Sequence, residues 1–427
     1  RTDIQIVITG ADGFIGKNLR VRLAELGYTK VTCISRATPP GSVAQALGTA
    51  DCVFHLAGTN RPQDPAEFVI GNATLTENLC AMLSAAGRRA VVVLASSTQA
   101  AVGGAYGSSK LAAEDAVRAY GAATQATVHV FRLTNVFGKW TRPNYNSAVA
   151  TFCHNIARGL PITINDPAAP LQLVYVDDVV QAFVGCIPGE GEGENPSTGS
   201  GRTDLEGAVG HPSTGSGRTD LEGAEGHPST GSGRTDLEGV SLDVVAPVYA
   251  TTVGEVAEIL HSFADGRSTL LIPRVGTGLV RALYSTYISY LPPAAFSYEV
   301  PRHADPRGVF VEMLKTPDCG QFSYFTAHPG ITRGDHYHHS KTEKFLVMKG
   351  TARFEFRHII TGETHVLVTQ GGEARIVESV PGWAHNITNI GDDEMIVMLW
   401  ANEVFDRRHP DTVAMKADMN VGMKVKS

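Results

Sequence analysis

The sequence predicts an α/β protein in which a doubly wound parallel sheet is followed by an antiparallel β barrel. Short β-branched segments at residues 4–9, 30–35, 51–56, 90–95 and 128–133 alternate with longer segments of helical periodicity. This alternation is typical of a parallel sheet with helices on both faces. From about residue 298 the pattern changes to short alternating segments divided by Gly and Asp turns, which indicates an antiparallel β barrel or sandwich.

A glycine-rich turn follows the first predicted strand and opens the first helix. Glycines at such a turn let the backbone N–H groups approach a pyrophosphate. The residues expected to contact a dinucleotide here are Gly10, Gly13, Phe14, Ile15 and Gly16. The end of the third predicted strand, expected beside the adenosine half of the cofactor, consists of Leu56, Ala57 and Gly58.

Arg36 follows the second predicted strand, where NAD sites usually carry an acidic residue for the ribose 2′-hydroxyl. A guanidinium at this place suits a 2′-phosphate instead. We therefore expect NADPH as the cofactor. The alternative is that Arg36 is only a solvated residue at a strand end.

Tyr106 and Lys110 lie four residues apart, a spacing that puts them on one face of a helix. The ammonium can then lower the pKa of the phenol and hold the nicotinamide ribose, while Tyr106 protonates a ketone oxygen. A hydroxyl at the end of the preceding strand would orient the carbonyl. The spacing favours Ser97 for this role, with Thr98 as the alternative.

These motifs together resemble the extended short-chain dehydrogenase/reductase family that acts on nucleotide sugars and has a Rossmann-like sheet. Further resemblance comes from the stretches at 72–78, 132–138 and 174–178. In that family, loops after the later strands hold the sugar nucleotide. The resemblance makes Asn135 and Arg142 candidates for contacts with a substrate diphosphate, although both could instead be turn residues.

Residues 188–239 contain a tandem repeat of 16 residues, marked by Pro196, Pro212 and Pro228. Each copy has a single Leu, so a copy cannot bury an apolar face against its neighbours. We expect a flexible insert without chemistry, the alternative being an array that binds a partner or calcium.

The α/β region resumes beyond the insert. Thr252 and Glu255 have the spacing of a capping box at the start of an amphipathic run over 253–263. The predicted organisation is a first part of the cofactor-binding domain at 1–187, the insert at 188–239, the rest of the substrate region at 240–297 and the β domain at 298–427.

The β domain carries the pattern H-x-H-x4-E followed by a later histidine. His336 and His338 share one strand face because side chains alternate with period two, so they can converge with Glu343 and His385 on one ion. These ligands suit Zn, Fe, Ni or Mn, and we take zinc as the expected divalent metal. The spacing is similar to that of the cupin family, except that Pro381 adjoins Gly382, which leaves the loop before His385 open.

A second interpretation concerns His336. The stretches at 305–312 and 330–337 resemble nucleotide-sugar epimerases of the cupin superfamily, in which the matching histidine is a base and no metal is needed. A metal-bound imidazole nitrogen has no free lone pair, so His336 is either ligand or base. A metal could polarise the ketone or could be structural.

Composition excludes several classes of protein. At 427 residues the chain should form two or three folding units, and 36 Lys and Arg against 43 Asp and Glu leave no basic field for nucleic acid. Its apolar stretches are far shorter than the ~20 residues of a membrane span, and the N-terminus does not resemble a secretion signal. The six cysteines form no C-x-x-C pair. We expect a cytoplasmic protein that acts without nucleic acid or membrane.

Taken whole, the chain resembles the CapF-type family of bifunctional capsular polysaccharide synthesis enzymes. The stretches at 137–146, 284–292, 344–347 and 401–406 carry this resemblance. It implies that the cupin epimerises a UDP-2-acetamido-2,6-dideoxy-4-hexulose next to its ketone. The reductase domain then reduces C4 with NADPH, on the route to UDP-N-acetyl-L-fucosamine. It also implies a homodimer.

Two other functions stay open at this point. In one, only the reductase works and the cupin is a structural dimerisation module. In the other, the protein is a nucleotide-responsive scaffold without turnover.

Overall fold

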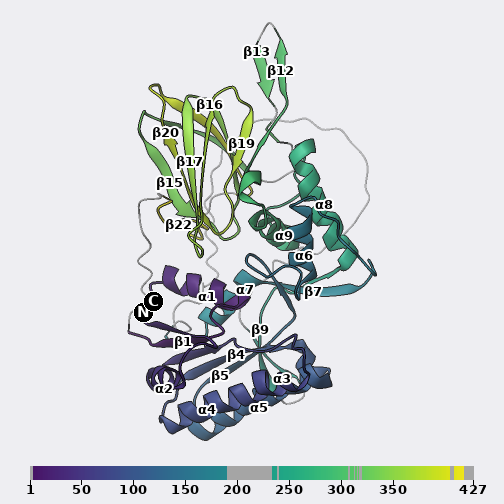
Figure 1. The fold of residues 1–427 in the computed structure, drawn as a ribbon, viewed down its shortest axis with the longest axis vertical. Helices are drawn as coiled ribbons and strands as arrows, with labels where there is room; N and C mark the ends of the chain where they lie inside the picture. Colours follow the sequence, from purple (N-terminus) through teal and green to yellow (C-terminus); the bar gives the residue numbers. More distant parts are fainter. Residues whose placement is uncertain are drawn as a thin grey trace, which may run out of the picture.

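The computed structural model describes residues 3–189, 233–237, 240–305, 308–311, 313–314, 316, 320–403 and 408–417. Most of the predicted repeat insert lies outside these residues. The described part has two halves joined end to end, with the parallel sheet at one end and the β domain at the other (Figure 1). Among the described residues, no helix has the length and apolar character needed to cross a bilayer.

The predicted parallel sheet is confirmed. Its strand order is β2-β1-β3-β4-β5-β9-β8, and every neighbouring pair except β8–β9 is parallel. The strands are β1 (Ile6–Thr9), β2 (Val31–Ile34), β3 (Cys52–His55), β4 (Val91–Ser97), β5 (Val128–Leu133), β8 (Gly233–Leu237) and β9 (Val240–Val244).

Helices cover both faces of this sheet. One face carries α1 (Phe14–Glu25) and α7 (Val176–Val184), and the other carries α2 (Pro40–Thr49), α4 (Leu75–Ala85) and α5 (Gly104–Thr124). Leu47, Leu83 and Val117 from the second face pack with Val53 and Val92 of the sheet in one buried cluster. Between β3 and α4 lie α3 (Ala66–Phe68) and the π-helical segment η1 (Val69–Thr74), and η2 (Thr98–Ala101) precedes α5.

Five residues of the third repeat copy, Gly233–Leu237, form β8 and pair antiparallel with β9. This strand lies within the stretch 188–239 that was predicted as a flexible insert, most of which lies outside the described residues. Backbone pairing at a sheet edge needs no apolar face on the added segment.

A middle layer joins the two halves. It contains the sheet β10-β7-β6 and three helices beside it. Its elements are β6 (Asn135–Phe137), α6 (Ala148–Ile156), β7 (Pro170–Tyr175), β10 (Tyr249–Thr252), α8 (Val253–Thr269), α9 (Gly278–Ser289) and η3 (Pro293–Ala295). The predicted capping box at Thr252 and Glu255 is confirmed, and α8 continues past the predicted end at 263 to Thr269.

The C-terminal half consists of two facing antiparallel sheets, as the sequence predicts. One has the order β11-β19-β16-β21-β14 and the other β18-β17-β20-β15-β22, while β12–β13 forms a separate hairpin. The strands are β11 (Ser297–Glu299), β12 (Arg302–Asp305), β13 (Gly308–Val311), β14 (Gln321–Ala327), β15 (Thr332–Tyr337), β16 (Glu343–Lys349), β17 (Thr351–His358), β18 (Thr364–Gln370), β19 (Arg375–Glu378), β20 (Trp383–Asn389), β21 (Met395–Ala401) and β22 (Val413–Ala414).

The two halves share buried contacts. Val21 of α1 and Trp140 pack against a small cluster in the β domain that includes Tyr337 and Ala384. Arg267 of α8 also forms an ion pair with the buried Glu378 of β19 at 2.8 Å. Glu378 also pairs with the buried Lys344 of β16, so a cluster of opposite charges lies where the two halves meet.

Candidate active sites

A cleft of about 880 Å³ lies at the carboxyl ends of β1, β3 and β4, where open α/β sheets bind their ligands. Most of the residues predicted for cofactor, catalysis and substrate line it together: Gly10, Gly13, Phe14, Ile15, Gly16, Leu56, Gly58, Ser97, Tyr106, Lys110, Asn135 and Arg142. Ala57 and Arg36 are not among the lining residues.

The glycine turn has the shape that a pyrophosphate needs. Gly10 has φ +69°, and a Cβ there would lie 2.7 Å from the backbone N of Ala57. A Cβ at Gly16 would lie 2.4 Å from the carbonyl oxygen of Gly10. Only glycine fits these two positions, and the turn leads directly into the N-terminus of α1, where backbone N–H groups favour an anion. These residues therefore fit a dinucleotide.

Arg36 is exposed and lies just beyond β2. The backbone N of Gly10 donates to the carbonyl of Ile34 at 3.2 Å, so the end of β2 lies beside the glycine turn. Arg36 therefore stands at the edge of the cofactor end of the cleft. Ala57 has a backbone role, because its N–H donates to Thr9 Oγ1 at 3.2 Å.

The cleft brings together Ser97 at the end of β4 and Tyr106 and Lys110 on α5. Burial raises the pKa of Tyr106, and a hydrogen bond with Ser97 opposes that rise. Burial lowers the pKa of Lys110 to about 8, and its Nζ donates to the carbonyl oxygen of Ala95 at 2.7 Å. The expected lowering of the phenol pKa by Lys110 is not seen, because burial dominates and the ammonium faces Ala95.

A buried hydrogen-bond chain behind the cleft was missed by sequence reasoning. Thr76 Oγ1 donates to the carbonyl of Asn72 at 2.7 Å, so the hydroxyl must accept from His55 Nε2 at 2.9 Å. His55 Nδ1 then accepts from Thr9 Oγ1 at 2.7 Å. Burial lowers the pKa of His55 to about 3, which keeps the imidazole neutral. The chain runs from the Ala57 N–H to η1.

Asn72 links this hydrogen-bond chain to α5, the helix that carries Tyr106 and Lys110. Its Nδ2 donates to Ser109 Oγ at 3.0 Å and to the carbonyl of Thr59 at 2.9 Å, while its Oδ1 accepts from the N–H of Thr59. Ser109 precedes Lys110 and donates to the carbonyl of Tyr106. One hydrogen-bond network thus fixes the loop after β3 and helix α5.

We expect Thr76→Val to lower the free energy of unfolding by about 1–3 kcal/mol, because it leaves the buried N–H of His55 without an acceptor. Thr76→Ser keeps the hydroxyl, so its free energy of unfolding should fall by less than half as much as that of Thr76→Val. Urea denaturation of the full chain measures both values. Equal losses in the two variants would contradict the stabilising role of the Thr76 hydroxyl.

The other end of the cleft carries the predicted substrate residues. Asn135 Nδ2 donates to the carbonyl of Gln172 at 3.2 Å. The Arg142 guanidinium lies 5.1 Å from the centre of the Tyr145 ring, and the Tyr145 hydroxyl donates to Asn60 Oδ1 at 3.0 Å. Tyr145 and Asn60, which also line the cleft, were not predicted from the sequence.

The β domain brings the four predicted metal ligands together. One ligand atom from each of His336, His338, Glu343 and His385 lies within 4.8 Å of the others. A bulge at Asp335 in β15 places His336 opposite His385 of β20, and the His336 ring centre lies 4.9 Å from that of His338. Sequence spacing alone could not place this bulge.

The hydrogen bonding of this cluster fits a cation. His338 Nδ1 donates to the carbonyl of Asp411, so Nε2 carries a lone pair when the ring is neutral. That Nε2 lies 3.1 Å from Glu343 Oε2, a contact that requires a proton or a metal ion between the two atoms. His385 Nε2 lies 3.4 Å from the same oxygen and has no hydrogen-bond partner among the described residues.

Two of the three histidine rings in this cluster have a lowered pKa. Burial, together with His385 and His338, lowers the pKa of His336 to about 3. Burial also lowers the pKa of His385, so the rings of His336 and His385 are neutral near pH 7. The pKa of His338 is raised instead, because nearby negative charges, chiefly that of Glu343, outweigh the effect of burial. A neutral imidazole is the form that binds a metal or accepts a proton.

The sequence around Pro381 and Gly382 did not predict the conformation of the loop before His385. In the structure this loop contacts the N-terminal half. Gly382 has φ +81°, and a Cβ there would lie 2.8 Å from the ring of Trp140. Gly382 N also donates to the carbonyl of His338 at 3.0 Å. Trp140 lines the cleft of the other half and also contacts Gly382, three residues before the candidate ligand His385.

Comparisons with known proteins agree with the division of the chain into two halves. Residues 6–196 match the NAD dependent epimerase/dehydratase family, and residues 303–413 match the polysaccharide biosynthesis C-terminal domain. Over 411 residues the chain is 50% identical to UDP-2-acetamido-2,6-beta-L-arabino-hexul-4-ose reductase of Pseudomonas aeruginosa, with 96% of this chain and 98% of the relative covered. The crystal structure of the capsular polysaccharide assembling protein CapF from Staphylococcus aureus has 35% identity and a TM-score of 0.60, covering 97% of this chain and all of that chain (100%). The chain belongs to the CapF-type family.

A second CapF structure, determined with the inhibitor 3-isopropenyl-tropolone, is 33% identical with a TM-score of 0.55 over 97% of this chain and 100% of that chain. CapF-type membership confirms the predicted pairing of a Rossmann-like reductase half with a cupin-like half. It makes the chain a nicotinamide-dependent oxidoreductase of polysaccharide biosynthesis.

Proposed function

We propose that this CapF-type enzyme acts twice on one UDP-linked sugar. The cupin half epimerises a UDP-2-acetamido-2,6-dideoxy-4-hexulose next to its ketone, and the reductase half reduces C4 with NADPH on the route to UDP-N-acetyl-L-fucosamine. The observation that carries the proposal is the convergence of Ser97, Tyr106 and Lys110 with the glycine turn in one cleft. The name of the 50% identical relative supports the substrate.

In the reductase half, the glycine turn would hold the pyrophosphate of a nicotinamide dinucleotide, which would supply the hydride. Ser97 holds the ketone oxygen by a hydrogen bond, and Tyr106 transfers its hydroxyl proton to that oxygen. Lys110, with a pKa of about 8, carries a positive charge at pH 7 and can stabilise the phenolate that remains. Arg142 and Asn135 line the opposite end of the cleft and are proposed to bind the UDP diphosphate.

In the cupin half, a divalent ion held by His336, His338, Glu343 and His385 would polarise the ketone. The convergence of the four ligand atoms supports the ligand role of His336 over the base role. Zinc is the ion that we propose, because imidazole nitrogens and a carboxylate suit it. The two reactions also belong together chemically, since a 4-ketone both acidifies the adjacent C–H and accepts hydride.

The proposal includes a homodimer in the cytoplasm. The alternative function, a reductase with the cupin as a structural dimerisation module, differs in one measurable respect. It predicts that the cupin exchanges no substrate hydrogen with solvent.

The direct test of the reductase step is incubation of the full chain with UDP-2-acetamido-2,6-dideoxy-4-hexulose and NADPH. We expect loss of NADPH absorbance in a ratio of one to one with the 4-hydroxy product. The same sugar as a thymidine diphosphate ester is the control for the nucleotide. Absence of oxidation with the UDP sugar would overturn the proposal.

Arg36→Ala should raise the KM for NADPH about tenfold and leave the KM for NADH unchanged, because a charge-assisted contact with the 2′-phosphate is lost. Arg36→Lys keeps the charge without the fork of the guanidinium and should show an intermediate KM. Steady-state kinetics with each cofactor measures both. A similar change for NADH would contradict the assigned role of Arg36.

A further inference from the structure

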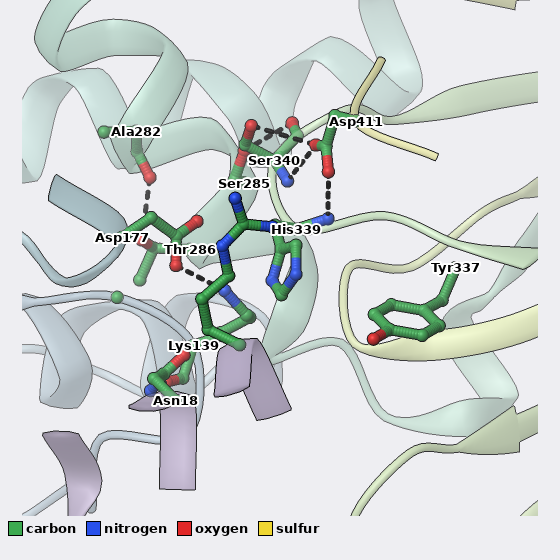
Figure 2. Close-up of polar contacts among 12 residues, drawn as sticks. Asn18, Lys139, Asp177, Ala282, Ser285, Thr286, Tyr337, His339, Ser340 and Asp411 are labelled. Carbon is green, nitrogen blue, oxygen red and sulfur yellow. Dashed lines mark hydrogen bonds and ion pairs between the residues drawn. The ribbon is translucent and has the colours of Figure 1, made fainter. Parts of the chain in front are cut away.

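The turn between two of the candidate metal ligands is held by one carboxylate from far along the chain. Asp411 Oδ1 accepts from the backbone N of His339 at 2.8 Å. Its Oδ2 accepts from the backbone N of Ser340 at 2.6 Å, the backbone N of Lys341 at 2.7 Å and Ser340 Oγ at 3.1 Å. Figure 2 shows this carboxylate facing Ser340 and His339. Three consecutive backbone N–H groups of the turn thus converge on a single side chain.

Asp411 also acts through its backbone. Its carbonyl oxygen accepts from His338 Nδ1, and because a carbonyl cannot donate, this bond places the ring hydrogen on Nδ1. Nε2 of His338 is thereby directed to Glu343 with its lone pair available. A metal-bound histidine commonly donates its other ring N–H in this way, which fixes the ring and its tautomer.

The segment that carries Asp411 is itself fixed beside a ligand strand. Directly after Asp411, β22 pairs with β15, with Ala414 opposite His336. The backbone N of Met415 donates to the carbonyl of Asp335 at 2.8 Å. The position of Asp411 is therefore determined by the strand that supplies His336.

The reductase half holds the other side of the same turn. Ser285 Oγ of α9 donates to the carbonyl oxygen of Ser340 at 2.6 Å. Arg281 of α9 donates to Ser340 Oγ and forms an ion pair with Glu403 at 3.0 Å. The turn thus lies between Asp411 and α9, with both in view around Ser340 and Ser285 in Figure 2.

We propose that Asp411 is a positioning residue for the cupin metal site: it holds the turn 339–341, and with it His338 and Glu343, in the geometry that binds the ion. This proposal rests on the proposed metal function of the cupin. It assigns no contact of Asp411 with the ion or the substrate.

The test is the zinc affinity of the full chain, measured by competition with a coloured chelator. Asp411→Ala should bind zinc 10–100-fold more weakly than the unchanged chain. This loss is typical when a residue that hydrogen-bonds to a metal ligand is removed. Glu403→Gln is the matched control, because Glu403 is a carboxylate at the same interface that, among the described residues, pairs with Arg281 and not with the turn itself. We expect its zinc affinity to stay within twofold.

Asp411→Asn provides a second variant that keeps the size of the side chain and one acceptor oxygen. Its zinc affinity should fall between those of the unchanged chain and Asp411→Ala. If Asp411→Ala does not fold, the zinc affinity of Asp411→Asn alone tests the positioning role. NADPH binding by the reductase half should be unaffected in Asp411→Asn. Unchanged zinc affinity in the folded Asp411 variants would overturn the role of Asp411 alone, whereas failure of the unchanged chain to bind zinc would overturn the metal function as well.

Discussion

Tyr106→Phe should lower the rate of NADPH oxidation by about 10²–10⁴-fold, because it removes the proton that the ketone oxygen receives as hydride arrives. Cofactor binding should persist, since the glycine turn and Lys110 are unchanged. The exchange of substrate hydrogen by the cupin should also persist. Stopped-flow absorbance of NADPH and proton NMR of the substrate in deuterated water measure the two activities separately.

Tyr120→Phe is the matched control for this variant. Tyr120 lies on the same helix, and its buried hydroxyl donates to the carbonyl of Arg88 at 3.0 Å, away from the residues that line the cleft. Tyr120→Phe should lower the free energy of unfolding slightly and keep the rate of NADPH oxidation within a few-fold of that of the unchanged chain. Joint loss of reduction and exchange in Tyr106→Phe would show that the division of labour between the two halves is wrong.

His336→Ala should abolish the exchange of hydrogen next to the ketone and leave NADPH binding intact. If His336 is a ligand, as the geometry supports, the variant should also lose most of its bound zinc. Loss of exchange with zinc retained would instead assign His336 as the base. Metal analysis and deuterium uptake, measured on the same sample, separate the two roles.

His328→Ala is the control for the loss of an imidazole. His328 is exposed just beyond β14 and belongs to neither candidate site. This variant should keep both exchange and zinc. Unchanged deuterium uptake in His336→Ala would rule out either role for His336.

Local sequence signals predicted most of the fold. The strand at 128–133 matches β5, and the capping box at Thr252 and Glu255 begins α8, because both depend on interactions within a few residues. The glycine turn was equally readable, since Gly16 is required by the close approach of Gly10 and Ala11 within the same turn. Periodicity and turn chemistry are therefore sufficient for these parts of the chain.

Contacts between distant segments could not be predicted in this way. The fit of Trp140 on Gly382 joins residues 242 positions apart, and Asp411 reaches a turn about 70 residues earlier in the chain. The bulge at Asp335 and the chain through His55 and Thr76 depend on register and on which polar atoms become buried together. No local pattern in the sequence carries that information.

The pairing of the two halves supports the idea that one sugar visits both sites. The measurement that tests it most directly is incubation of the UDP-4-keto sugar and NADPH with the full chain in deuterated water, followed by NMR of the product. We expect deuterium on the carbon next to C4 in every molecule that has been reduced at C4. A reduced product without deuterium at that carbon would contradict the account.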